Sequence, residues 1–213
     1  PLIADFDKDG DIDFVVAGGT DMPLWAPNYY YKNNAGVFER IEIGERAWSH
    51  GSAMADINQD GFMDVIFTGY GSDEEQKPGL QIGLGGLNGF TFYSPLDEWG
   101  SLRISGSGVT AGDFINPGDG KLEIVLTDSE FRYQNDENDI SLYSWDFTTD
   151  NQIKLTELTN LPAPYFETNP ADYFSGSHDI RAYQQDFNSD GLADIIVTSL
   201  PGNRIPGAPD VDD

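Results

Sequence analysis

The sequence predicts an all-β protein that is built from repeated four-stranded antiparallel units. Three observations lead to this expectation. A short acidic loop that runs straight into an apolar strand occurs four times within the 213 residues. The composition is rich in turn and strand formers, with 24 Gly, 12 Pro, 13 Phe and 10 Tyr, as in turn-rich β proteins. No segment carries a capped apolar stripe of 3.6-residue period, so we expect little helix.

The acidic loops define the repeat. Three of them fit the pattern D-x-[DN]-x-D-G-x-x-D without a gap, and successive loops begin 51, 57 and 73 residues apart. We number the loops in chain order and count positions 1 to 9 within each. Loops 1 to 4 are DFDKDGDID (5–13), DINQDGFMD (56–64), DFINPGDGKLE (113–123) and DFNSDGLAD (186–194).

Each complete repeat contains four segments that we expect to form strands. A short strand leads into the loop, as in SAMAD, VTAGD and AYQQD. A strand that is apolar on both faces leaves it, as in FVVAG, VIFTG, IVLTD and IIVTS. An alternating strand such as GLQIGLG follows, and then a more polar one such as FERIEIG or KLTELT, which suits an outer edge. A period near 50 with four strands predicts the blades of a β-propeller.

The chain holds about 3.5 such blades, with repeats that start near residues 2, 52, 108 and 180. We assign residues 1–200 to the blades and 201–213 to an irregular acidic, Pro-rich tail. An incomplete propeller has open strand edges. We therefore expect the chain to be part of a seven-bladed or similar ring within a longer protein. The alternative is self-association of two copies through the open blade edges.

Composition limits the partners. A formal charge of −26 argues against nucleic acid and anionic membranes, because both attract a basic surface. No stretch approaches the roughly 20 apolar residues of a membrane helix, so we expect no membrane insertion. The chain has no Cys, which excludes disulfides, zinc–thiolate sites and cysteine nucleophiles.

The acidic loops have the chemistry of calcium sites. Ca²⁺ prefers six to eight oxygen ligands, and carboxylate or amide oxygens at positions 1, 3, 5 and 9 can surround one ion together with the carbonyl of position 7. Gly at position 6 permits the left-handed backbone of the sharp reversal. The predicted ligands are Asp5, Asp7, Asp9, Asp13 and the Asp11 carbonyl; Asp56, Asn58, Asp60, Asp64 and the Phe62 carbonyl; and Asp186, Asn188, Asp190, Asp194 and the Leu192 carbonyl.

Loop 3 departs from the pattern because Pro117 and Gly118 form an insertion. Its candidate ligands are Asp113, Asn116, Asp119 and Glu123. We therefore expect three calcium sites, with loop 3 as a fourth candidate.

Two other interpretations of the loops fit the sequence less well. An Asp-Gly turn that merely joins two strands explains the Gly and one Asp, but not three further acids at fixed offsets. An EF-hand requires Glu at position 12 and flanking helices. Position 12 is instead Val16, Phe67 or Val197, each inside an apolar strand, so an EF-hand is excluded.

The loop with its following strand, as in DFDKDGDIDFVVAGG and DFNSDGLADIIVTS, resembles the FG-GAP/VCBS repeat family, which includes the calcium-binding blades of integrin α-chains. The resemblance implies a β-propeller with calcium in the loop between strands 1 and 2 of a blade. It also implies an extracellular, cell-surface or periplasmic location, although no signal peptide is visible in this chain.

A ligand is expected on the end of the blades opposite the acidic loops, where the other connections lie. Aromatic rings there can stack on sugars or anchor a protein; the alternative is that they pack the loops onto the blades. The candidate binding residues are Trp25, Trp48, Trp99, His50 and His178.

Three functions are compatible with the sequence. The first is a non-enzymatic recognition or adhesion module for a glycan or an extracellular protein. The second is a structural or accessory domain of a larger surface protein. The third is a polysaccharide-active enzyme, a lyase or a hydrolase. No catalytic motif is present, so no catalytic residue is assigned and we expect a protein that is not an enzyme.

Overall fold

A computed structural model describes residues 1–19, 25–72, 76–95, 106, 108–115, 121–127, 139–162, 181–185, 187 and 194–198. The regular elements of this part are all β-strands, with turns and bends between them, as the sequence predicts. The strands are β1 Leu2–Ala4, β2 Asp13–Val16, β3 Ala26–Asn34, β4 Val37–Ala55, β5 Asp64–Tyr70, β6 Leu80–Leu84, β7 Thr91–Tyr93, β8 Gly108–Gly112, β9 Glu123–Thr127, β10 Asp139–Phe147, β11 Ile153–Pro162, β12 Arg181–Gln185 and β13 Asp194–Thr198.

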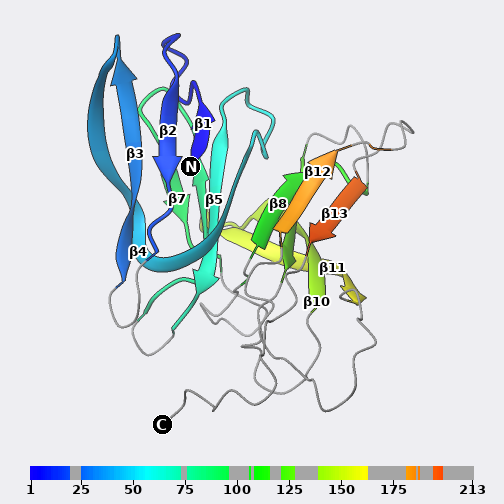
Figure 1. The fold of residues 1–213 in the computed structure, drawn as a ribbon. Coiled ribbons are helices and arrows are strands. Elements are labelled where there is room, and N and C mark those ends of the chain that lie inside the picture. The colour runs from blue at the N-terminus through cyan, green and yellow to red at the C-terminus, as the bar shows by residue number, and fades with distance from the viewer. Residues whose placement is uncertain are drawn as a thin grey trace, which may run out of the picture.

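The strands form four antiparallel units in chain order. Unit 1 contains β1, β2, β3 and the first half of β4, and unit 2 contains the second half of β4 with β5, β6 and β7. Unit 3 is the sheet β8 to β11, and unit 4 is the pair β12–β13. Figure 1 shows units 1 and 2 on one side and units 3 and 4 on the other. Three four-stranded units and half of a fourth agree with the sequence prediction.

One connection differs from the prediction. The sequence predicts a loop between the first two units at residues 42–51, but β4 runs without a break through 19 residues. Its first half pairs with β3 and its second half with β5. The long strand bends as it passes from one unit to the next (Figure 1). Register shifts between Ala26 and Asn28 on β3, and between Ser49 and Gly51 on β4, lie near this bend. Such irregularities increase local twist and bending.

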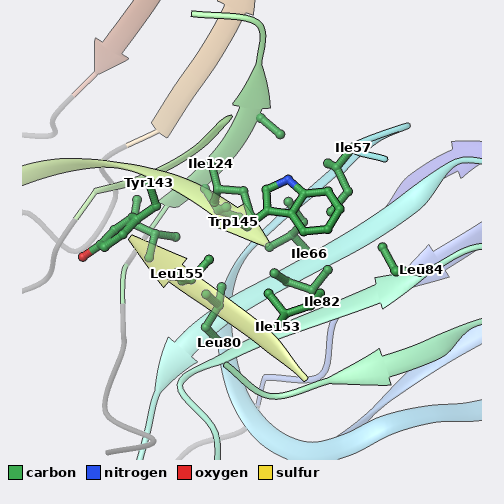
Figure 2. Packing of buried hydrophobic residues seen from close by; sticks show 13 residues of the cluster. Ile57, Ile66, Leu80, Ile82, Leu84, Ile124, Tyr143, Trp145, Ile153 and Leu155 are labelled. Atoms are coloured by element: carbon green, nitrogen blue, oxygen red, sulfur yellow. The ribbon is translucent and has the colours of Figure 1, made fainter. Parts of the chain in front are cut away.

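The largest core lies between units 2 and 3. Every residue of β6, β8 and β9 is buried, because each of these inner strands has a packed neighbour on both faces. Ile66 and Ile82 of unit 2 meet Ile124 and Trp145 of unit 3, and Ile57 of loop 2 joins them. Figure 2 shows these side chains pointing toward one another from the two units.

A second core joins units 1 and 2. Val15 and Tyr30 of unit 1 pack with Val65 and Phe67 of unit 2, and Phe6 of loop 1 belongs to the same cluster. The Phe6 ring makes edge contacts with Tyr30 and Phe90 at centroid distances of 6.1 and 5.4 Å. Each acidic loop that is fully described thus inserts one apolar side chain between neighbouring units.

Within the described residues, the structure contains no helix of the length and apolar character required to cross a membrane.

The interface between units 2 and 3 gives a first prediction. Ile66 is fully buried in it, so Ile66→Ala removes apolar contacts and leaves a cavity. We expect the free energy of unfolding to fall by about 2–5 kcal/mol, measured by urea unfolding. The control is Val37→Ala, since Val37 is 71% exposed and its change should stay within about 0.5 kcal/mol. Equal effects of the two variants would contradict this packing.

Candidate metal centre

Each acidic loop joins the first two strands of its unit. Loop 1 links β1 to β2 and loop 2 links β4 to β5, and both lie at the same end of units 1 and 2 (Figure 1). The acid at position 9 is the first residue of the outgoing strand. It pairs with the residue just before position 1 in every unit: Ala4 with Asp13, Ala55 with Asp64, Gly112 with Glu123 and Gln185 with Asp194.

Within loop 1, carboxylates accept hydrogen bonds from the backbone of the turn. Asp5 accepts from the N–H groups of Asp9 (3.1 Å) and Gly10 (3.0 Å). Asp7 accepts from Asp9 N at 3.3 Å, and Asp9 accepts from Asp11 N at 2.9 Å. Side-chain to backbone bonds of this kind favour a turn over extended strand.

Loop 2 repeats this geometry position by position. Asp56 accepts from Asp60 N at 2.9 Å and from Gly61 N at 2.8 Å. Asn58 accepts from Asp60 N at 3.1 Å, and Asp60 accepts from Phe62 N at 2.8 Å. The two loops therefore share one conformation although they differ at five of nine residues.

Two positions of each loop have positive φ. Gly10 and Gly61 at position 6 have φ of 95° and 92°, as the sequence predicts for the sharp reversal. Position 4 is also left-handed, with φ of 60° at Lys8 and 54° at Gln59. A side chain is uncommon in this region, and neither Lys nor Gln at position 4 predicts it.

The carboxylate at position 9 is the most buried part of the site. Asp13 and Asp64 are both fully buried. Asp13 accepts from Phe6 N at 3.1 Å, Asn33 N at 2.8 Å and the Tyr30 hydroxyl at 2.9 Å. These bonds tie the loop, the outgoing strand and the third strand together.

Asp64 makes the two corresponding backbone connections in unit 2. It accepts from Ile57 N at 2.8 Å and from Gly85 N at 2.7 Å. The bond to position 2 also recurs in the last two units, from Phe114 N to Glu123 at 2.8 Å and from Phe187 N to Asp194 at 2.9 Å. Position 9 therefore has the same structural role in all four units, including the irregular loop 3.

Burial and the neighbouring acids change the protonation behaviour of these groups. Burial raises the pKa of Asp64 to about 6, although its backbone hydrogen bonds oppose the rise. Burial, followed by the hydrogen bond to Asp13, raises the pKa of Tyr30 far above its ordinary value. The hydrogen bond to Asp7 raises the pKa of Lys32. Anionic side chains in these loops thus carry an electrostatic cost that a cation relieves.

The loop 1 carboxylates converge as a cation site requires. Asp5, Asp7 and Asp13 each present an oxygen within 4.8 Å of the others, and Asp7 is only 7% exposed. All three donors are hard anionic oxygens, the ligands that Ca²⁺ prefers. A carboxylate oxygen that accepts one backbone N–H retains a second lone pair. The residues present therefore fit a calcium ion.

A cleft of about 450 Å³ lies beside loop 1 between units 1 and 2. Its lining includes Asp7 and Lys32 of unit 1 together with Phe90 and Phe92 of unit 2. The Asp7–Lys32 pair therefore borders this cleft.

The other predicted metal ligands are only partly described by the structure. Asp9 and Asp60 lie in their turns as expected. The Asp11 side chain accepts from Ala35 N at 2.7 Å, which fixes loop 1 to the β3–β4 turn. In loop 3, Asp113 and Glu123 are described, and Glu123 is buried. Outside the described residues lie Asn116, Asp119, Asp186, Asn188, Asp190 and Leu192.

The predicted ligand-binding residues are only partly described, because Trp99 and His178 fall outside the described residues. Trp48 and His50 lie within β4, where a loop was expected, and their rings are 5.2 Å apart. Trp25 precedes β3 next to the Ala26–Ala47 pair, so it lies near Trp48. These three side chains are half-buried at the end of unit 1 away from loop 1.

Sequence reasoning missed two contributors to the site. The apolar residue at position 2, Phe6 or Ile57, anchors its loop in the core. The sequence contains a signal for this anchor, because all four loops have an apolar residue at position 2. The other contributor is Lys32, whose ammonium contacts Asp7 and lies 3.9 Å from Asp9. It comes from β3, and no local pattern connects it to loop 1.

Four-stranded antiparallel units with an acidic loop between their first two strands define a class of repeat protein. The sequence profile of the FG-GAP-like repeat matches residues 5–67, a stretch that contains loops 1 and 2. Residues 5–67 are thus an FG-GAP-like repeat. The units are blades of a β-propeller, and within the described residues their sheets do not close into a ring.

A comparison with curated proteins finds similarity to the T-cell immunomodulatory protein homolog of Plasmodium falciparum (isolate 3D7). The two sequences are 32% identical over 138 residues. The matched region covers 59% of this chain and 19% of that protein, so the chain spans a small part of the relative's length.

Asp64 predicts a pH dependence for the metal-free protein. Its pKa is raised from 3.8 to about 6 on folding. The associated stabilisation is therefore complete below about pH 4 and is lost as the pH rises through about 6. We expect the free energy of unfolding of the wild type to fall over this window relative to Asp64→Asn, by on the order of 3 kcal/mol.

The measurement is urea unfolding in chelator at a series of pH values. Asp150→Asn is the control, because Asp150 is exposed in the β10–β11 turn, and its curve should run parallel to the wild type. Parallel curves for the wild type and Asp64→Asn would contradict the raised pKa.

Proposed function

We propose that this chain forms calcium-stabilised propeller blades of a surface protein and acts in non-enzymatic recognition of a glycan or an extracellular protein. The convergence of Asp5, Asp7 and Asp13 in loop 1 is the observation that supports it most directly. The matching conformation of loop 2 extends the argument to a second site.

The proposed role of calcium is structural. Each loop gathers several carboxylates on a short turn, and their mutual repulsion opposes folding. A divalent cation offsets that repulsion, so its binding free energy adds to the stability of the folded state. The position 9 carboxylate connects the ion to the loop, the outgoing strand and the third strand of the unit, which stiffens the whole hairpin region.

The surface role rests on two facts. Residues 5–67 are an FG-GAP-like repeat, and the similar Plasmodium protein is named as an immunomodulatory protein, which is consistent with action at a cell surface. Propeller blades present their loops from a rigid scaffold, which suits recognition. We assign binding to the end opposite the acidic loops, where Trp25, Trp48 and His50 lie together.

Calcium removal gives the first test. We expect a chelator to lower the melting temperature by about 5–10 °C, because one site occupied at a hundred times its Kd contributes about 2.7 kcal/mol and 1 kcal/mol corresponds to about 2–4 °C at this size. Asp60→Ala should remove part of the calcium-dependent shift, whereas Asp150→Ala should retain it in full. A melting curve that is identical in calcium and in chelator would refute a calcium role.

Ligand recognition is tested separately. We expect the calcium-loaded chain to bind a subset of a glycan array and to lose that binding in chelator. Trp48→Phe should weaken binding by about tenfold if the indole stacks on a sugar, while the calcium-dependent melting shift stays unchanged. A blank array from folded, calcium-loaded protein would reject glycan recognition and leave an extracellular protein as the ligand.

A further inference from the structure

Loops 1 and 2 share one conformation but differ in charge. At positions 1, 3, 5 and 9, loop 1 has four carboxylates, whereas loop 2 has three carboxylates and the neutral Asn58 at position 3. The additional carboxylate is Asp7, which is buried. An additional buried anion among three others is costly unless it is paired.

Lys32 supplies the pairing charge. Its ammonium contacts the Asp7 carboxylate directly and lies 3.9 Å from the Asp9 carboxylate. The Lys32 side chain is 29% exposed and that of Asp7 is 5% exposed, so the pair is partly shielded from solvent. With this ammonium included, loop 1 carries the same net charge as loop 2.

In loop 2 a neutral amide takes the place of the buried carboxylate at position 3. The Asn58 Nδ2 group donates to Asp60 Oδ2 at 2.9 Å, so position 3 supplies a donor to position 5. In loop 1 the residue at position 3 is an acceptor only, and the donor beside positions 3 and 5 is the Lys32 ammonium. The Asp7–Lys32 pair therefore takes the place of one asparagine.

The strand register identifies the residue of unit 2 that corresponds to Lys32. Lys32 follows Tyr31, which pairs with Phe14, and Leu84 follows Gly83, which pairs with Val65. Both positions thus stand beside the position 9 acid. Leu84 is buried in the core between units 2 and 3 and carries no charge. The two units therefore differ at two related positions together: unit 1 has Asp7 with Lys32, and unit 2 has Asn58 with Leu84.

We propose that Lys32 is a resident cation that determines the calcium affinity of loop 1. This inference rests on the proposed function, since it concerns the same loops. The ammonium holds loop 1 in its folded form without metal, and it must leave Asp7 when calcium binds there. Loop 1 consequently binds calcium more weakly than loop 2, and unit 1 depends on calcium less than unit 2 for its stability.

A double-mutant cycle on the whole 213-residue chain tests this. The variants are Lys32→Leu, Asp7→Asn and the combination of both, which copies Asn58 and Leu84 of unit 2. The control is Lys154→Leu, the same change at an exposed site on β11. The probes are calcium chloride, melting curves with and without chelator, and NMR shifts of the Gly10 and Gly61 amides, which report loops 1 and 2 separately because each bonds within its own loop.

We expect Lys32→Leu to bind calcium at loop 1 about tenfold more tightly, because a unit charge close to the ion no longer opposes it. The same variant should melt lower than the wild type in chelator and regain that loss in saturating calcium. The double variant should recover most of the chelator stability and bring the loop 1 affinity close to that of loop 2. Loop 2 and the Lys154→Leu control should remain unchanged.

Three outcomes would overturn the inference. If Gly61 responds to calcium while the Gly10 response is the same in the wild type and Lys32→Leu, Lys32 does not set the affinity and the proposed calcium function stands. If Lys32→Leu loses equal stability with and without calcium, Lys32 is only a structural partner of Asp7. Absence of any calcium response at either glycine would reject the proposed calcium role and this inference with it.

Discussion

The structure of each unit depends on the carboxylate at position 9 of the acidic loop, which is buried in the first three units. Its oxygens accept a hydrogen bond from the N–H of position 2 in all four units. In the first two units they also accept one from the N–H of Asn33 or Gly85, at the end of the third strand. A buried anion with several backbone donors fixes loop, outgoing strand and third strand in one register. The apolar side chain at position 2 is thereby directed into the space between units, so one polar contact determines how neighbouring sheets pack.

The surrounding acids serve a different purpose. Positions 1, 3 and 5 shape the turn by accepting its backbone N–H groups. In loop 1 the carboxylates of positions 1 and 3 also converge with that of position 9. A turn built in this way is ordered by local hydrogen bonds and strained by like charges at the same time. The two loops balance these effects with different residues, an asparagine in one and a lysine–aspartate pair in the other.

Much of the fold could be predicted from the sequence because its signals are local and repeated. The acidic loops, the apolar strands after them and the Gly at position 6 lie within one stretch of each repeat, and the strand order followed from them. The continuity of β4 was not predicted, because the polar run around Glu45 and Arg46 is typical of a loop. Lys32 was also missed, since its relation to Asp7 arises only when β3 pairs with β2. Contacts made by strand pairing leave no pattern in a single sequence.

The unbroken β4 strand has a consequence for how the first two units move. Units joined by a loop can tilt independently, whereas the 19 residues of β4 are hydrogen-bonded to β3 along one half and to β5 along the other. Seven strands consequently form one continuous ladder, and opening either half of β4 disturbs the other. The first two units therefore constitute a single cooperative segment in local unfolding, and an event at one of their loops is transmitted through a shared strand instead of across a flexible joint.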